Sequence, residues 1–192
     1  MSTAFIDIDT QLDFLYPAGA LYVPKAERIV PEIARLNRFA ASSGIPLVST
    51  ADAHSETDPE FRMWPPHCVA GTWGQRKPEA TLVDKRVVVP NRLELPDLAG
   101  AKQIIIEKQT VDAFQAPNFQ RVLDRLGAEH CVVYGVVTEV CVLHAVRGLL
   151  RTGRKVTVVS DAIETLKAEA AQQALAEMCS GGAVLATSAT LT

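Results

Sequence analysis

Six short runs of apolar residues predict β-strands along the chain. Several of these runs are apolar at consecutive positions, which is typical of strands that are covered on both faces, as parallel strands are. The six predicted strands span residues 4–8, 46–50, 103–107, 131–136, 155–160 and 183–187.

Helical spacing of apolar residues fills three of the intervals between these runs. Gly153 stands where the third helix should end. The alternation of strands and helices predicts right-handed βα units in an α/β fold, a three-layer αβα sandwich around a mainly parallel sheet of roughly six strands. The residues that mark the helices are Ile29, Ile33, Leu36 and Phe39 for the first, Val122, Leu123 and Leu126 for the second, and Val142, Ala145, Val146 and Leu149 for the third.

Composition and charge indicate which broad class of protein this chain belongs to and which partners to expect. The 192 residues are 48% hydrophobic and 21% charged, which is typical of a globular protein, and we expect one domain over residues 1–192. The formal net charge is −3 and no long basic cluster occurs, so nucleic acid is not an expected partner. No segment approaches the length of a membrane span, and the N-terminus MSTAFIDIDT lacks the pattern of a signal peptide. We expect a cytoplasmic protein whose four irregularly spaced cysteines are reduced thiols.

The segment GVVTEVC predicts a turn from a strand into a helix, with Cys141 in the first turn of that helix. Unpaired N–H groups at a helix N-terminus favour a thiolate and offer a binding site for an oxyanion. A nucleophilic cysteine is one interpretation. The alternative is a buried structural cysteine, because free cysteines are among the residues most often buried.

Two further candidates follow predicted strands at the carboxyl edge of the sheet, where function is expected in such folds. Asp9 ends the run FIDID, and strand alternation predicts that it shares a face with Asp7. Lys108 follows the run QIIIE. Each alone has an ordinary explanation, a capping aspartate or a lysine that reaches solvent. Together with Cys141 they form an acid, a base and a thiol at the ends of three strands.

A possible metal site lies in the long irregular stretch 51–100. Asp52 and His54 directly follow a predicted strand, and His67 arrives from the loop, so the three could bind a metal with open positions. Glu60 could supply a further oxygen ligand. The alternative is a turn with a capping aspartate. Either way, a connection of this length inside a compact domain is more often functional than not.

Four ordered motifs, spread along nearly the whole chain, resemble the isochorismatase-like cysteine hydrolases, and among them the nicotinamidases. The first is the opening strand with its Asp-x-Gln-x-Asp-Phe turn in FIDIDTQLDF. STADAH and WPPHCVAGTWG resemble the metal-loop signatures of the family, IIEKQTVDAF resembles its lysine strand, and VVYGVVTEVCV resembles the strand that leads to the nucleophile. Four motifs in this order are far more specific than any one of them.

The resemblance implies roles for single residues. Asp9, Lys108 and Cys141 would form a catalytic triad. Asp52, His54 and His67, with Glu60 as a fourth ligand of some members, would hold one divalent metal ion, with zinc expected and iron or manganese as alternatives. A cis peptide would join Val137 to Thr138, the N–H groups of Val137 and Cys141 would form the oxyanion hole, and Phe14 and Trp64 would sandwich a planar substrate ring.

The resemblance also implies an activity: hydrolysis of nicotinamide to nicotinate and ammonia through a thioester, in pyridine-nucleotide salvage. Glu139 and Val140 stand where the family often has an aspartate and an aromatic or polar residue, so we expect a more apolar pocket beside the cysteine. The alternatives are another small amide or an N-carbamoyl substrate, hydrolysis by a metal-bound water with a structural Cys141, and a domain without catalysis. A homo-oligomer is expected by resemblance only.

Overall fold

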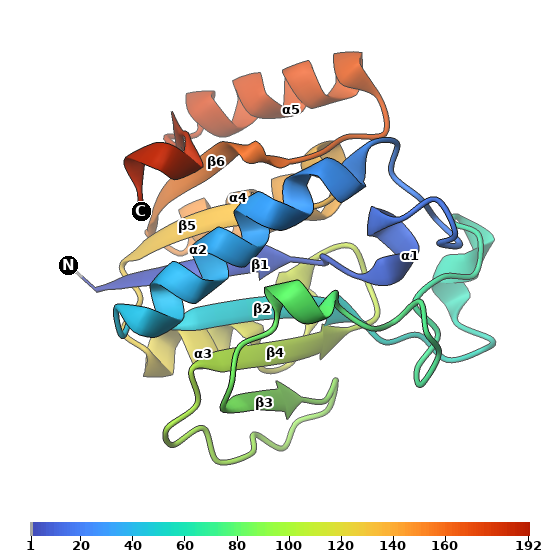
Figure 1. Cartoon of the computed structure of the whole chain (residues 1–192), viewed down its shortest axis with the longest axis horizontal. Helices are drawn as coiled ribbons and strands as arrows, with labels where there is room; N and C mark the ends of the chain where they lie inside the picture. Colours follow the sequence, from blue (N-terminus) through green and yellow to red (C-terminus); the bar gives the residue numbers. More distant parts are fainter. Residues whose placement is uncertain (1) are drawn as a thin grey trace.

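A seven-stranded, entirely parallel sheet forms the centre of the structure, a computed structural model that describes residues 2–192 (Figure 1). The strand order is β3-β4-β2-β1-β5-β6-β7. The order reverses after β1, so β1 lies in the middle of the sheet and adjoins both β2 and β5. The strands are β1 (Thr3–Ile8), β2 (Leu47–Asp52), β3 (Arg86–Val89), β4 (Gln103–Lys108), β5 (His130–Gly135), β6 (Lys155–Ile163) and β7 (Val184–Ala186).

The six predicted strands are therefore confirmed, and β3 is one strand more than the sequence predicted. The segment RVVV of β3 has four residues, of which only Val89 is buried, and it lies at the edge of the sheet inside the long irregular stretch. An edge strand this short leaves little hydrophobic pattern to detect.

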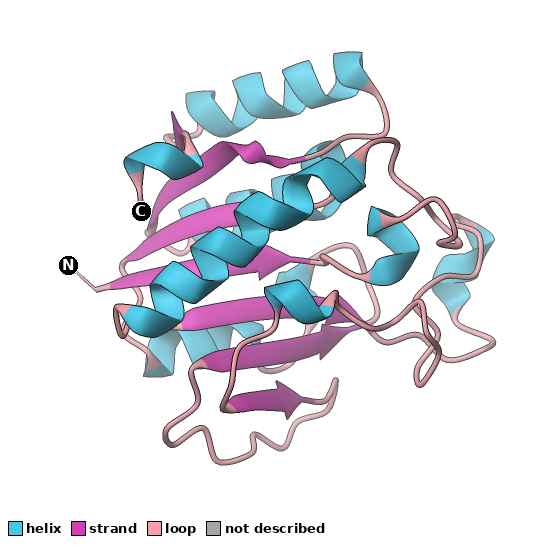
Figure 2. Cartoon of the chain, viewed as in Figure 1, coloured by secondary structure: helices cyan, strands magenta, loops and turns pink. Residues whose placement is uncertain are grey.

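Helices cover both faces of the sheet, as predicted for a three-layer sandwich (Figures 1 and 2). Apolar residues of α1 and α2 pack together on one face, and those of α3, α4 and α5 share the core on the other. Figure 1 shows α2 crossing in front of the strands with α3 and α4 behind them. The helices are α1 (Leu12–Leu15), α2 (Val30–Ser42), α3 (Phe119–Arg125), α4 (Leu143–Arg151) and α5 (Ala168–Ser180).

The predicted end of α4 is confirmed. Gly153 has a φ of 78°, a left-handed conformation that glycine adopts without strain. Its N–H donates to the carbonyl of Leu150, and the N–H of Arg154 donates to the carbonyl of Leu149. These two bonds close the helix with a Schellman-type cap.

The helix α5 was not predicted. Its sequence AEAAQQALAEMCS buries only Ala171, Ala174 and Met178, so its apolar stripe is made mainly of small residues. Among the described residues, none of these helices is long and apolar enough to cross a membrane.

Candidate active site and metal centre

The carboxyl ends of three central strands bring Asp9, Lys108 and Cys141 together. Lys108 is the last residue of β4, Asp9 follows β1, and Cys141 lies in the turn after β5. The Nζ of Lys108 is 2.8 Å from Oδ2 of Asp9, and the thiol of Cys141 lies close enough to both side chains for each to shift its pKa. All three side chains are buried. The structure thus places an acid, a cation and a thiol close together.

Strand alternation predicted that Asp9 shares a face with Asp7, and this prediction is wrong. Asp9 has a φ of 48°, so the chain turns out of the β conformation directly after Ile8 and period-two alternation no longer applies. The Asp9 carboxylate accepts a 2.6 Å bond from the Thr50 hydroxyl, while Asp7 accepts one from Ser49. Because Ser49 and Thr50 are consecutive residues of β2, the two aspartates face opposite sides of the sheet.

The turn that carries Cys141 is a single wide helical turn, Thr138–Val142, which runs directly into α4. The carbonyl of Val137 accepts the N–H groups of Val140 and Val142, and both the N–H and the hydroxyl of Thr138 donate to the carbonyl of Glu164. Cys141 is therefore held near the N-terminal end of a helix, as the sequence predicted.

The predicted cis peptide is displaced by one residue. The cis bond joins Val136 to Val137, not Val137 to Thr138. The physical reason is that the chain leaves β5 at Val136, whereas Thr138 is already the first residue of the helical turn.

Charge compensation holds Lys108 protonated. Burial alone would lower the pKa of Lys108, but the carboxylates of Asp52 and Asp9 raise it well above its ordinary value. The ammonium group donates to Oδ1 of Asp52 at 2.5 Å and to the carbonyl of Thr110 at 3.0 Å, and it forms an ion pair with Asp9. Burial would raise the pKa of Asp52, but Lys108 with the two nearby histidines holds it well below its usual range.

The thiol itself is not poised as a thiolate, contrary to the expectation from its helix position. Burial raises the pKa of Cys141 well above its ordinary value, and Lys108 offsets this only in part because Asp9 faces the sulfur. Burial also raises the pKa of Asp9, against the opposing influence of Lys108. The resting thiol keeps its proton beside a carboxylate that can accept it.

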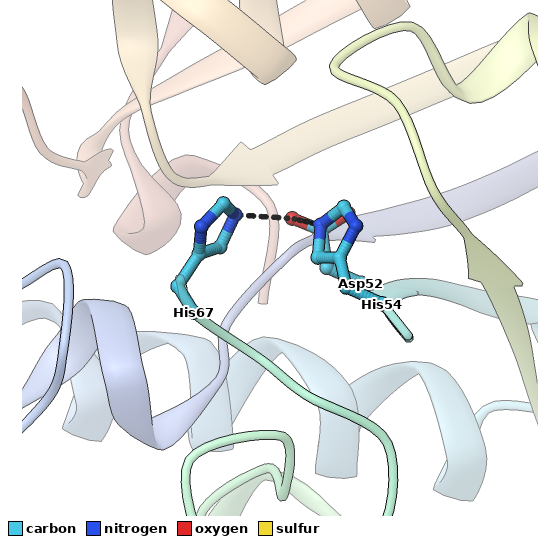
Figure 3. A group of neighbouring side chains, drawn as sticks. All are labelled: Asp52, His54 and His67. Atoms are coloured by element: carbon cyan, nitrogen blue, oxygen red, sulfur yellow. Dashed lines mark ion pairs between the residues drawn. The ribbon is translucent and has the colours of Figure 1, made fainter. Parts of the chain in front are cut away.

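Asp52, His54 and His67 converge at the end of β2 (Figure 3). The Nε2 atoms of His54 and His67 lie 3.9 and 3.7 Å from the same oxygen, Oδ2 of Asp52. His54 is fixed by backbone bonds on both sides, because its N–H donates to Cys68 and its carbonyl accepts from Ala70. The three predicted ligands therefore share one small, buried space.

These residues fit a divalent metal ion. The Nε2 of His54 and the Oε2 of Glu60 are buried and have no hydrogen-bond partner among the described residues, an unfavourable state that a cation would relieve. The Nδ1 of His67 lies 2.7 Å from the carbonyl of Pro65, which turns Nε2 toward the other ligands. Burial, followed by the Asp52 carboxylate, raises the pKa of Glu60, an effect that a bound cation would reverse.

Asp58 is a site residue that the sequence analysis missed. Its Oδ2 lies 3.1 Å from Nδ1 of His54, and its Oδ1 accepts the N–H of Glu60. A carboxylate behind a histidine orients the ring and leaves the other nitrogen free for a metal. The detectable signal was DPE, an aspartate before a proline, which is typical of a helix N-cap.

A pocket opens onto Cys141 and onto three of the predicted metal ligands, Asp52, Glu60 and His67. The two predicted aromatic residues, Phe14 and Trp64, both line it. Val111, Val140 and Leu166 make the rest of its wall largely apolar, in agreement with the expectation for Val140.

Glu139 does not line this pocket. Its carboxylate accepts bonds from the hydroxyl of Thr165 and from the N–H groups of Leu166 and Lys167. The side chain that stands where the family often has an aspartate therefore holds the segment 165–167 in place, next to the pocket wall.

Gln11 and Asp13, from the motif DTQLD, hold the site together without lining the pocket. The side-chain amide of Gln11 donates to the carbonyls of Asp52 and Gln75, and its oxygen accepts the N–H of Asp52. The carboxylate of Asp13 accepts the N–H of Cys68 at 2.7 Å, directly after His67. Sequence reasoning from the residues alone assigned neither a role.

Comparisons with known proteins agree with this architecture. The nicotinamidase of Saccharomyces cerevisiae is 25% identical over 192 residues, an alignment that covers 81% of this chain and 85% of the yeast protein. The N-carbamoylsarcosine amidase of an Arthrobacter species is 24% identical over 152 residues, which is 78% of this chain and 54% of that protein. The crystal structure of the pyrazinamidase of Pyrococcus horikoshii in complex with zinc superimposes with a TM-score of 0.80 at 29% identity, covering 97% of this chain and 99% of that one.

The family model of the isochorismatase domain matches residues 3–190, which is nearly the whole chain and includes every residue of the site described above. The chain therefore belongs to the isochorismatase domain family.

Proposed function

We propose that the protein is a cysteine amidohydrolase that converts nicotinamide, or a closely similar small aromatic amide, to the carboxylic acid and ammonia. The observation that carries this proposal is the cluster of Asp9, Lys108 and Cys141 beside a pocket that Cys141 lines together with Asp52 and His67, two of the predicted metal ligands. The relatives named above as nicotinamidase and pyrazinamidase support the same class of reaction.

In the proposed mechanism Asp9 takes the proton of Cys141, and the sulfur attacks the amide carbonyl. Lys108 balances the negative charge that Asp9 and the sulfur share. The N–H groups of Val137 and Cys141 bind the oxygen of the tetrahedral intermediate. Asp9 then gives the proton to the departing ammonia, which leaves a thioester on Cys141.

Water completes the reaction. Asp9, ionised again, removes a proton from a water molecule as that water attacks the thioester, and the acid leaves as the thiol is restored. The raised pKa of Asp9 suits a group that must both accept and return a proton. The net change is one amide and one water converted to one acid and one ammonia.

Asp52, His54 and His67, with Glu60, would hold the metal ion, for which zinc is the first candidate. A bound divalent ion supplies an open coordination position that can fix a ring nitrogen of the substrate. Phe14 and Trp64 would hold the ring between them, so the carbonyl carbon faces Cys141.

An amidase for an N-carbamoyl amino acid is the second candidate, because the Arthrobacter relative carries that name. Such a substrate bears a carboxylate. Among the described residues that line the pocket, none is an arginine or a lysine, and the wall is largely apolar. A neutral aromatic amide therefore fits this lining better.

Ammonia release over a panel of amides tests the proposal. Purified protein loaded with zinc should release ammonia from nicotinamide and pyrazinamide far faster than from N-carbamoyl amino acids. Turnover of an N-carbamoyl compound without turnover of nicotinamide would reject the substrate proposed here and favour the second candidate.

A further inference from the structure

A second buried aspartate-lysine pair lies on the opposite face of β1 from Asp9 and Lys108. The Nζ of Lys77 is 3.2 Å from Oδ2 of Asp7, and both side chains are at most 2% exposed. The hydroxyl of Thr10 joins the two, since it donates to Oδ1 of Asp7 at 2.6 Å and accepts from Lys77 at 2.8 Å. None of these three residues lines the pocket at Cys141.

The pair is supported by further buried polar groups. Ser49 donates to Oδ2 of Asp7 at 2.9 Å and accepts from the side chain of Gln103, also at 2.9 Å. On the side of α2, Tyr134 donates to Asn37 at 2.6 Å. Burying an ion pair seldom increases stability over an apolar alternative, so a network this complete points to a need for a defined geometry.

The geometry that the network defines is the turn at Asp9. Asp9 is a non-glycine residue at a φ of 48°, a conformation that costs energy and persists only where the surroundings fix it. On one side of the sheet Thr50 holds the carboxylate and the N–H of Asp9. On the other side the next residue, Thr10, is fixed by Asp7 and Lys77.

Lys77 also connects this turn to the metal loop, residues 53–77, which carries the predicted ligands His54 and His67. It ends the segment in which the carbonyl of Gln75 accepts from Gln11 and the carbonyl of Arg76 accepts from Leu12. Gln11 in turn holds the backbone of Asp52. Hydrogen bonds therefore join the strand β1, the turn at Asp9 and the metal loop to one another.

We propose that Asp7, Thr10 and Lys77 are positioning residues, which act through the backbone of the Asp9 turn to hold the Asp9 carboxylate against the thiol of Cys141. This inference rests on the proposed function, because it assigns Asp9 as the base. None of the three is proposed to touch substrate or metal.

The test is to replace Thr10 by Val, which keeps the shape and removes the hydroxyl, and by Ser, which keeps the hydroxyl. Thr10→Val should lower kcat about 10- to 100-fold through misplacement of Asp9, with KM and zinc content unchanged. Thr10→Ser should restore most of kcat. Thr157→Val is the matched control, because it removes the hydroxyl that bonds His130 at the opposite end of the sheet, and kcat should not change.

A second measurement does not depend on the amide substrate. Alkylation of Cys141 by iodoacetamide, followed by mass spectrometry of its peptide, should slow in Thr10→Val and recover in Thr10→Ser. Site-specific detection is needed because Cys179 is exposed. If Thr10→Val folds poorly, Asp7→Asn serves as the second variant and should show the same pattern.

Unchanged kcat and unchanged alkylation in a folded Thr10→Val protein would overturn the inference, even if its Tm fell. An equal loss of kcat in Thr10→Ser and Thr10→Val would overturn it as well, since the hydroxyl would then not be the cause. A wild type without amidase activity, in which Thr10→Val still slows alkylation, would reject the proposed substrate and leave the positioning role intact.

Discussion

Replacing Lys108 by Met should uncover how much of the site depends on one cation. Lys108 is 1% exposed and lies 2.8 Å from Asp9 and 2.5 Å from Asp52. Methionine fills nearly the same space without the charge. The variant therefore buries two carboxylates that no longer have a cation between them.

The magnitude follows from the two contacts. With an effective dielectric constant of about 20, each contact corresponds to an attraction of about 6 kcal/mol, most of which offsets the cost of burying the charges. Removing one partner of a buried ion pair typically costs about 3 to 5 kcal/mol. We expect the free energy of unfolding of the metal-free variant to fall by that amount at pH 8, which is a large part of the stability of an ordinary domain.

The loss should depend on pH in a defined direction. Burial already raises the pKa of Asp9 in the folded state above its ordinary value of 3.8, and Lys108 is the main group that lowers it. Without Lys108 the folded-state pKa of Asp9 rises further. Between 3.8 and that pKa the folded state binds more protons than the unfolded state, so the stability of the variant falls as the pH rises. The difference from wild type should be smaller at pH 5 than at pH 8.

Urea unfolding of wild type and Lys108→Met, followed by circular dichroism at pH 5, 6.5 and 8, measures both effects. Lys102→Met is the control, because Lys102 is exposed and its replacement should change the free energy of unfolding by less than about 0.5 kcal/mol. A difference below 1 kcal/mol, or one that does not change with pH, would refute the charge-compensation reasoning.

Three other predictions concern the metal loop. Chelation of zinc from the zinc-loaded protein should lower the Tm by about 5 to 10 °C, as expected when a ligand at about 100 times its Kd is removed. A thermal scan with and without chelator tests this, and an unchanged Tm would contradict it. Glu60→Gln should weaken zinc binding at least about tenfold in a competition titration. Glu56→Gln is the control and should leave zinc binding unchanged, because Glu56 is an exposed residue of the same loop. Equal zinc affinities of the two variants would exclude Glu60 as a ligand. Gly74→Ala would place a Cβ 2.1 Å from the Asp13 carboxylate. The free energy of unfolding in urea should therefore fall by at least about 2 kcal/mol, and zinc binding should weaken. Wild-type values of both would show that Asp13 can move without loss.

Much of this fold is legible in the sequence because its strands are buried. The run QIIIEK of β4 is almost fully buried, and the predicted helix α4 has one continuous apolar side. The strand β3 and the helix α5 were not predicted. An edge strand exposes most of its residues, and the alanine-rich buried stripe of α5 is little more hydrophobic than the residues around it. Hydrophobic contrast, and not length alone, decided which elements could be predicted.

The site residues divide in a similar way. Asp9, Lys108 and Cys141 were detectable because each stands at the end of a predicted strand, where parallel topology collects side chains. Asp58 and Lys77 lie in loops. Asp58 contacts His54, 4 positions away in the chain, and Lys77 contacts Asp7, 70 positions away. No periodic pattern reports such contacts. The left-handed turn at Asp9 likewise depends on partners from other elements, so alternation gave the wrong face.

Turnover of nicotinamide by wild-type protein and by Cys141→Ala, both loaded with zinc to equal content, tests the central claim most directly. The account predicts steady ammonia release by the wild type and a loss of at least about 1,000-fold in kcat for the variant, because the thiol is the nucleophile. Substantial turnover by Cys141→Ala would contradict it, and would mean that water activated at the metal site performs the hydrolysis while Cys141 is structural.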